Sequence, residues 1–315
     1  MKRLVSVAAL FTLLSVFAIT AIAQKPKSRD ELIKEIVTLS NTKKPEDSEK
    51  AYQLGKEFLT RFGSEKNDKG EVIGKIRDFV NRYREGQFFT KLDAKDYSGA
   101  FPIGKEILAE QPDNVEITMN LAYGGYMALA AGTDKSLSDD AVTYARKTLQ
   151  LMEAGSVPKN FAPFKDKDDA RAWMYYIDGS ITAPKDMKSA ASTFYKATTF
   201  ENSIKNSSQP YIVIAYYFED VYEKLAADYK VKAASKTLTA EALKVENDRM
   251  DKAMDLMMDA YARALKYGEA ENNPSKGQWK DRLTVIYKFR KKTEAGLPEY
   301  INSVSTTPIA DPGKF

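Results

Sequence analysis

The chain has 315 residues, of which 43% are hydrophobic and 11% aromatic. This composition is typical of a folded protein and excludes an intrinsically disordered one. Lys and Arg number 48 against 44 Asp and Glu, so the nearly neutral balance gives no case for nucleic-acid binding or for a polybasic membrane surface. Histidine and cysteine are both absent, which excludes Ser-His and Cys-His nucleophile pairs, disulfides and the usual structural zinc site.

The first 23 residues have the pattern of a secretory signal peptide. Two cationic residues precede an apolar run at 4–22, which ends in a small-x-small cleavage sequence at 21–23. We expect cleavage after Ala23, a polar leader at 24–28, and a bacterial periplasmic or secreted protein without stable membrane insertion. The alternative is an uncleaved anchor, because about twenty apolar residues span a bilayer. Lacking cysteine, the chain is not a lipoprotein.

After the leader, apolar residues recur at helical spacing, and no stretch shows the alternation typical of a strand. Clusters of Gly, Pro, Asn and Asp divide the pattern, because these residues end helices and form turns. The predicted helical segments are, in chain order, 29–39, 45–62, 71–91, 98–108, 115–129, 140–151, 170–177, 190–198, 210–229, 239–267 and 278–292. The sequence therefore predicts an all-α protein.

Small residues lie on the contact stripes of two consecutive segments. The first stripe carries Leu121 and Gly125, and the second carries Ala141, Ala145 and Leu149. Two such helices approach closely and lie antiparallel, but so thin a pair must be covered on both sides by neighbouring pairs. This pattern predicts an α-solenoid.

The spacing of these residues resembles that of a tetratricopeptide repeat. The clearest second-helix match has Ala100 in its first turn, Ile107 and Leu108 at its end, and Pro112 after it. The resemblance covers most of 29–292. It implies a right-handed superhelix of about five antiparallel helix pairs followed by a C-terminal cap helix.

Four segments depart from this repeat pattern. We expect an insertion at 130–139, an irregular Pro- and Phe-rich connection at 155–167, a loose segment at 231–238, and a disordered Pro-containing tail at 293–315. The phenylalanines at 155–167 are expected to pack on the neighbouring repeat. The aspartates at 166–169 precede a helix and are expected to cap it rather than to bind a metal.

The first helices of a tetratricopeptide array line its concave face, and this register implies a partner-binding groove. The residues it nominates are Phe89, Met119, Tyr123, Tyr126, Met127, Met174, Asp178, Tyr216, Lys280 and Tyr287. Aromatic and Met side chains dominate, which suits a peptide or helix with apolar anchors. At each position the alternative is a side chain that packs between repeats. The Lys, Arg and Asn clamp that some family members use for a C-terminal carboxylate is not recognisable.

We therefore expect an exported scaffold that binds a protein or peptide, without catalysis, cofactor or metal. A second hypothesis is a binder of cell-envelope glycan or peptidoglycan, in which Tyr123, Tyr126 and Tyr216 stack on sugar rings. A third is a hydrolase that uses two carboxylates, because glycosidases need no more than these. No nucleotide-binding loop occurs in the sequence.

Overall fold

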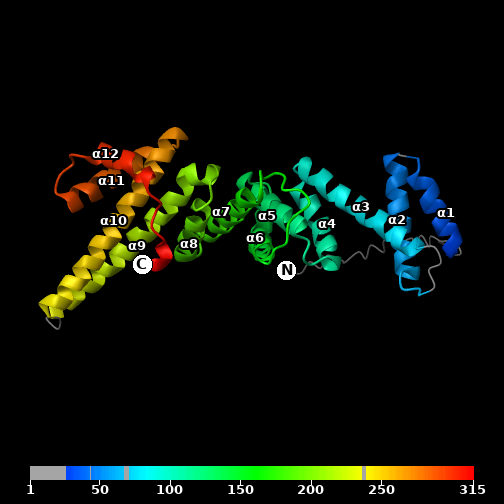
Figure 1. Cartoon of the computed structure of the whole chain (residues 1–315), viewed down its shortest axis with the longest axis horizontal. Helices are drawn as coiled ribbons and strands as arrows, with labels where there is room; N and C mark the ends of the chain where they lie inside the picture. The colour runs from blue at the N-terminus through cyan, green and yellow to red at the C-terminus, as the bar shows by residue number, and fades with distance from the viewer. Residues whose placement is uncertain (1–25, 43, 67–70, 236–238) are drawn as a thin grey trace, which may run out of the picture. The chain divides into compact units, whose positions relative to one another are not determined.

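The computed structural model describes residues 26–42, 44–66, 71–235 and 239–315. Over these residues the protein consists of α-helices with short 3₁₀ turns, and no strand occurs among them (Figure 1). This confirms the predicted all-α class. The predicted signal peptide and its cleavage site lie outside the described residues.

Twelve α-helices follow one another along the described part of the chain. They are α1 (Arg29–Ser40), α2 (Pro45–Phe62), α3 (Val72–Asp93), α4 (Tyr97–Glu110), α5 (Val115–Ala130), α6 (Ser138–Glu153), α7 (Lys167–Thr182), α8 (Met187–Thr198), α9 (Ser208–Ser235), α10 (Ala240–Ala270), α11 (Lys276–Lys291) and α12 (Leu297–Ser303). From α4 to α11 each helix packs against the next one in the sequence. This consecutive packing matches the expected series of helix pairs.

The chain divides into two compact units, with the boundary inside α3 after Val80. In the first unit α1 packs on α2, burying Leu32 and Phe58 completely. Gly55 of α2 lets the Val80 side chain approach, since a Cβ at this glycine would lie 2.7 Å from a Val80 methyl carbon. The second unit, from Asn81 onwards, holds the remaining helices and the site described below.

Side-chain caps fix several helix starts. The Asp166 carboxylate accepts hydrogen bonds from the backbone N–H groups of Asp168 and Asp169, at 3.0 and 2.9 Å. The Thr239 hydroxyl accepts one from the N–H of Ala242, at 3.2 Å. Both caps satisfy N–H groups that have no partner inside the helix. The predicted capping role of Asp166 is confirmed, and the Thr239 cap lies at the predicted start of the 239–267 segment.

The small residues of α5 and α6 produce the expected close approach. A Cβ placed on Gly125 would lie 2.8 Å from the Ala141 Cβ and 3.0 Å from the Phe101 ring. Leu121, Ala141 and Ala145 are completely buried. Any side chain larger than hydrogen at Gly125 must therefore push the two helices apart.

Two of the four predicted irregular segments, the one at 231–238 and the tail at 293–315, differ from expectation. Helix α9 continues to Ser235, so residues 231–235 are helical rather than loose, because this segment contains no Gly or Pro to end the helix. Residues 236–238 lie outside the described part. None of the described residues between Phe218 and Ala253 is buried, although Val221 and Tyr222, near the base of this hairpin, pack against the core. The 130–139 insertion contains a 3₁₀ turn at Lys135–Leu137.

The C-terminal tail has defined structure, in contrast to the predicted disorder. Helix α12 packs on α10, and buried Val304 and Ile309 join the core formed by α8 to α11. The Phe315 ring lies edge-on to Phe218, with ring centres 5.8 Å apart. The prolines suggested disorder, but apolar residues between them supply enough contact to hold the tail.

The close approach of α5 and α6 predicts opposite effects for two Gly to Ala substitutions. Gly125→Ala should lower the free energy of unfolding by about 1–3 kcal/mol, because its methyl group overpacks the contact with Ala141. Gly86→Ala, in open space on α3, should raise it by about 0.5–1 kcal/mol through helix propensity. Urea unfolding followed by circular dichroism measures both. Equal effects would contradict the tight contact.

The packed tail predicts a cost for shortening its buried side chain. Ile309→Ala should destabilise the protein by about 2 kcal/mol or more, since Ile309 is 7% exposed. The control Thr307→Ala, at an exposed position two residues away, should change stability by less than about 0.5 kcal/mol. Urea unfolding of the two variants checks this, and no difference between them would mean that the tail is not packed.

Candidate functional site

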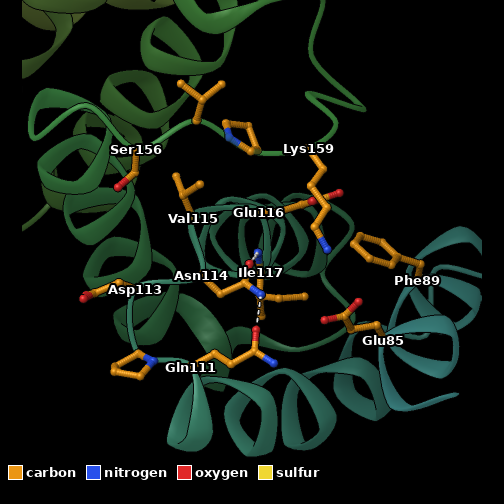
Figure 2. A pocket seen from close by; sticks show the side chains of 13 residues that line it. Glu85, Phe89, Gln111, Asp113, Asn114, Val115, Glu116, Ile117, Ser156 and Lys159 are labelled. Atoms are coloured by element: carbon orange, nitrogen blue, oxygen red, sulfur yellow. Dashed lines mark hydrogen bonds between the residues drawn. The ribbon is translucent and has the colours of Figure 1, made fainter. Parts of the chain in front are cut away.

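A pocket of about 550 Å³ lies in the second unit where α3, the start of α5 and the loop after α6 meet (Figure 2). Glu85 and Phe89 of α3 form one side, and Glu116 of α5 lies at the centre. Val157 and Lys159 of the loop form the opposite side. The loop belongs to the irregular connection expected at 155–167.

A second pocket, of about 310 Å³, adjoins the first because Phe89 and Glu116 line both. Its other walls include Tyr97, Asn120 and Tyr123, with loop residues 160–163 on the far side. We call the two pockets together the α3–α5 groove. Its walls are divided almost evenly between apolar or aromatic side chains and polar or charged ones.

The turn before α5 determines where Glu116 points. The Asn114 side chain accepts a hydrogen bond from the N–H of Ile117, at 3.2 Å, and donates one to Gln111 Oε1, at 2.9 Å. These two bonds fix the first turn of α5 (Figure 2). Glu116, in that turn, is thereby held facing the groove.

Glu116 is a partly buried carboxylate. Burial raises its pKa above the ordinary value, the backbone amide and positive charge of Lys159 oppose this effect, and Glu85 raises the pKa further. Figure 2 shows the Lys159 side chain extending from the loop toward Glu116 and Glu85. The groove therefore brings two carboxylates and one ammonium group into the same region.

Asn120 lies one turn further along α5 and is 6% exposed. Its side-chain Nδ2 donates a hydrogen bond to the Glu116 carbonyl, at 2.9 Å, which sets the orientation of the amide. Asn120 lines the second pocket, and within the described residues its Oδ1 accepts no hydrogen bond. This oxygen is an acceptor available to a ligand.

Aromatic side chains hold the loop against α5 and α7. The Tyr123 ring lies edge-on to Phe164 and Trp173, with ring centres 5.4 and 6.0 Å apart. Tyr126 lies edge-on to Trp173 and Tyr176, at 6.4 and 5.9 Å. Edge-to-face pairs at these distances stabilise packing beyond simple burial. Phe164 is 7% exposed, which confirms that the loop packs on its neighbours.

The structure brings only two of the ten nominated groove residues into this site, Phe89 and Tyr123. Three others are core residues: Met119 and Met174 are fully buried and Tyr287 is 7% exposed, so they contact neighbouring helices instead of a partner. The tetratricopeptide register placed these three residues next to the row of side chains that packs on neighbouring helices. In the structure this row is wide enough to include them.

The other five nominated residues line neither pocket. Tyr126 and Met127 are partly buried among the helices of the core. Tyr216 on α9 and Lys280 on α11 are exposed. Asp178 is 6% exposed and is held by Arg146, so it serves packing between α6 and α7.

Sequence reasoning missed the polar residues of the groove. Glu85, Glu116, Asn120 and Lys159 carry no motif, and charged or amide side chains near helix starts are common on any surface. The one sequence feature that pointed to the groove was the long 155–167 connection, because a loop with this many Pro and Phe residues packs against neighbouring helices. Which helix it would cover depends on the tertiary structure.

No match is found when the chain is compared with models of known protein families, with curated proteins or with solved structures. Among the described residues, no group of three or more acidic side chains is arranged to hold a metal ion. No helix in the described part is both long and apolar enough to cross a bilayer. The assignment of function therefore depends on the groove itself.

The position of Asp178 predicts a structural rather than a binding role. Its two oxygens accept hydrogen bonds from Arg146 at 2.9 and 2.8 Å and from Thr182 at 2.9 Å. Asp178→Asn should lower the free energy of unfolding by about 1–3 kcal/mol, because one acceptor becomes a donor that faces a guanidinium. The exposed pair of Asp139 and Lys185 provides the control: Asp139→Asn should cost about 0.5 kcal/mol or less. Urea unfolding distinguishes the two, and a similar small loss for both would place Asp178 outside the core.

Proposed function

We propose that this protein is an exported, non-catalytic tetratricopeptide-like scaffold that binds a peptide or an exposed protein segment in the α3–α5 groove. The observation that carries the proposal is the groove itself. Two adjoining pockets of about 550 and 310 Å³ share Phe89 and Glu116 between a helix pair and a packed loop. A groove of this length suits an extended chain with side chains in successive pockets better than one small molecule.

The arrangement of groups supports a peptide partner. The apolar side chains Phe89, Val157 and Tyr123 offer surfaces for anchor residues, and Val157 is 59% exposed. Polar groups at Glu116 and Asn120 are positioned to hydrogen-bond a backbone or side chain. A few buried apolar anchors with polar groups around them are typical of peptide-recognition surfaces.

The tetratricopeptide assignment, with its right-handed superhelix, belongs to the same proposal. Its support is the consecutive packing of α4 to α11 and the repeat-like spacing around Ala100 and Pro112. The cleavage pattern at 21–23 supports export to the periplasm or beyond.

The two rival functions have weaker support. In a glycan binder Tyr123 and Tyr126 would present ring faces, yet both rings are engaged edge-on with other aromatics. A carboxylate hydrolase has one supporting observation, the pKa of Glu116, which burial raises above its ordinary value and which would suit an acid beside Glu85. We therefore propose binding without turnover.

Peptide selection on the immobilised mature protein tests this function. Peptides enriched from a random library should lose about tenfold or more in affinity for Phe89→Ala, since this ring lines both pockets. Val157→Ser, at an exposed position, should weaken binding without affecting folding. The control Phe289→Ala removes an exposed ring from α11 and should leave affinity unchanged. Selected peptides that bind all four proteins equally would contradict binding in the groove.

A further inference from the structure

We infer that the segment bound in the α3–α5 groove presents a lysine or arginine side chain next to an apolar residue, with the cation placed among the acceptors around Glu116. This inference rests on the proposed peptide binding and specifies the chemistry of the partner.

The charges of the groove provide the first argument. Four carboxylates line it, Glu85, Asp93, Asp113 and Glu116, against the single ammonium group of Lys159. Asp113 is already paired with Lys147 outside the lining, at 2.9 Å. The groove therefore retains three carboxylates to one cation, and a positively charged partner is the complement.

The absence of ion pairs at these three carboxylates is the second argument. Within the described residues, Glu85, Asp93 and Glu116 form no salt bridge with any Lys or Arg. Nearby Glu110, by contrast, holds Arg84 at 2.7 Å. Asp93 is exposed, but Glu85 and Glu116 are partly buried; a partly buried carboxylate without a paired cation is unfavourable, and binding a cation relieves this cost.

Asn120 supplies an independent argument. Its side chain is more than nine-tenths buried, it lines the second pocket, and its amide nitrogen is already used by the Glu116 carbonyl. Because this bond uses one of the two Nδ2–H donors, the Oδ1 acceptor and the second N–H are left for a ligand. An acceptor beside carboxylates favours a hydrogen-bond donor, and Lys and Arg side chains are donors only.

The groove also fits the apolar part of such a side chain. Phe89 lies between the two pockets, so its ring can pack against the methylene stem of a Lys or Arg whose charged end reaches Glu116. Val157 and Tyr123, on either side, provide surfaces for an apolar neighbour. These contacts explain why a peptide side chain is preferred to a metal ion, for which the described residues offer no cluster of ligands.

Lys159 occupies the approach to this position. It is exposed on the loop, and its side chain extends toward Glu116 and Glu85 (Figure 2). An incoming cation must displace or avoid this ammonium group. The chain's own lysine thus competes with the partner, and its removal should strengthen binding.

The test compares short synthetic peptide pools that share one apolar anchor and differ at a neighbouring position, occupied by Lys, Arg, Met or Glu. Fluorescence anisotropy with the full mature chain should show the Lys and Arg pools binding about tenfold tighter than the Met and Glu pools. Raising NaCl from about 0.05 to 0.5 M should reduce this preference, because salt screens exposed charges.

Substitutions then locate the cation. Glu116→Gln and Asn120→Leu should each weaken the Lys pool about fivefold or more while leaving the Met pool unchanged, and Lys159→Met should tighten the Lys pool. Asp139→Asn, which removes a carboxylate that lines neither pocket, is the matched control and should change nothing. Since Asn120 is buried, circular dichroism establishes that its variant folds, and Glu85→Gln, at a position that is only partly buried, provides the same test with less effect on folding.

The outcomes separate the two proposals. Met and Lys pools that bind equally, with a loss on Phe89→Ala, would overturn the cationic preference and leave peptide binding in place. A preference for the Glu pool would also overturn it. If no pool binds and selected peptides ignore Phe89→Ala, both proposals are wrong.

Discussion

The contact between α5 and α6 at Gly125 and Ala141 is the constraint on which the site depends. Because Gly125, late in α5, meets Ala141, early in α6, and Lys147 of α6 pairs with Asp113 just before α5, the end of α6 lies beside the start of α5. The loop that leaves α6 therefore passes over the first turn of α5, where Glu116 lies. A wider separation would move the loop away from α3 and remove the wall that closes the groove.

Aromatic packing holds the other end of this loop. Phe164 is fixed between Tyr123 of α5 and Trp173 of α7, so the loop is attached to two consecutive helix pairs. The rings that the sequence suggested as partner contacts are thus used to position the polar groups that face the groove. This division of roles explains why carboxylate and amide groups, beside the aromatic cluster, face the groove.

The sequence predicted the helices well and the site poorly, for different physical reasons. Periodicity, caps such as Asp166 and the small residues at Gly125 act locally, so they locate helices and their close contacts without any tertiary information. The nomination of Met119 and Met174 failed because burial depends on how many helices surround a position. Glu116 and Asn120 became recognisable only when the loop was seen to lie above them.

The outer half of the α9/α10 hairpin has a consequence for motion. Since none of its described residues between Phe218 and Ala253 is buried, its helices are held mainly by each other and by surface pairs such as Lys232 with Glu246. Local opening there exposes little apolar surface and costs far less than global unfolding. Amide hydrogens in the described part of this arm should therefore exchange with solvent through local opening, whereas those of α5 and α6 exchange only when the unit unfolds.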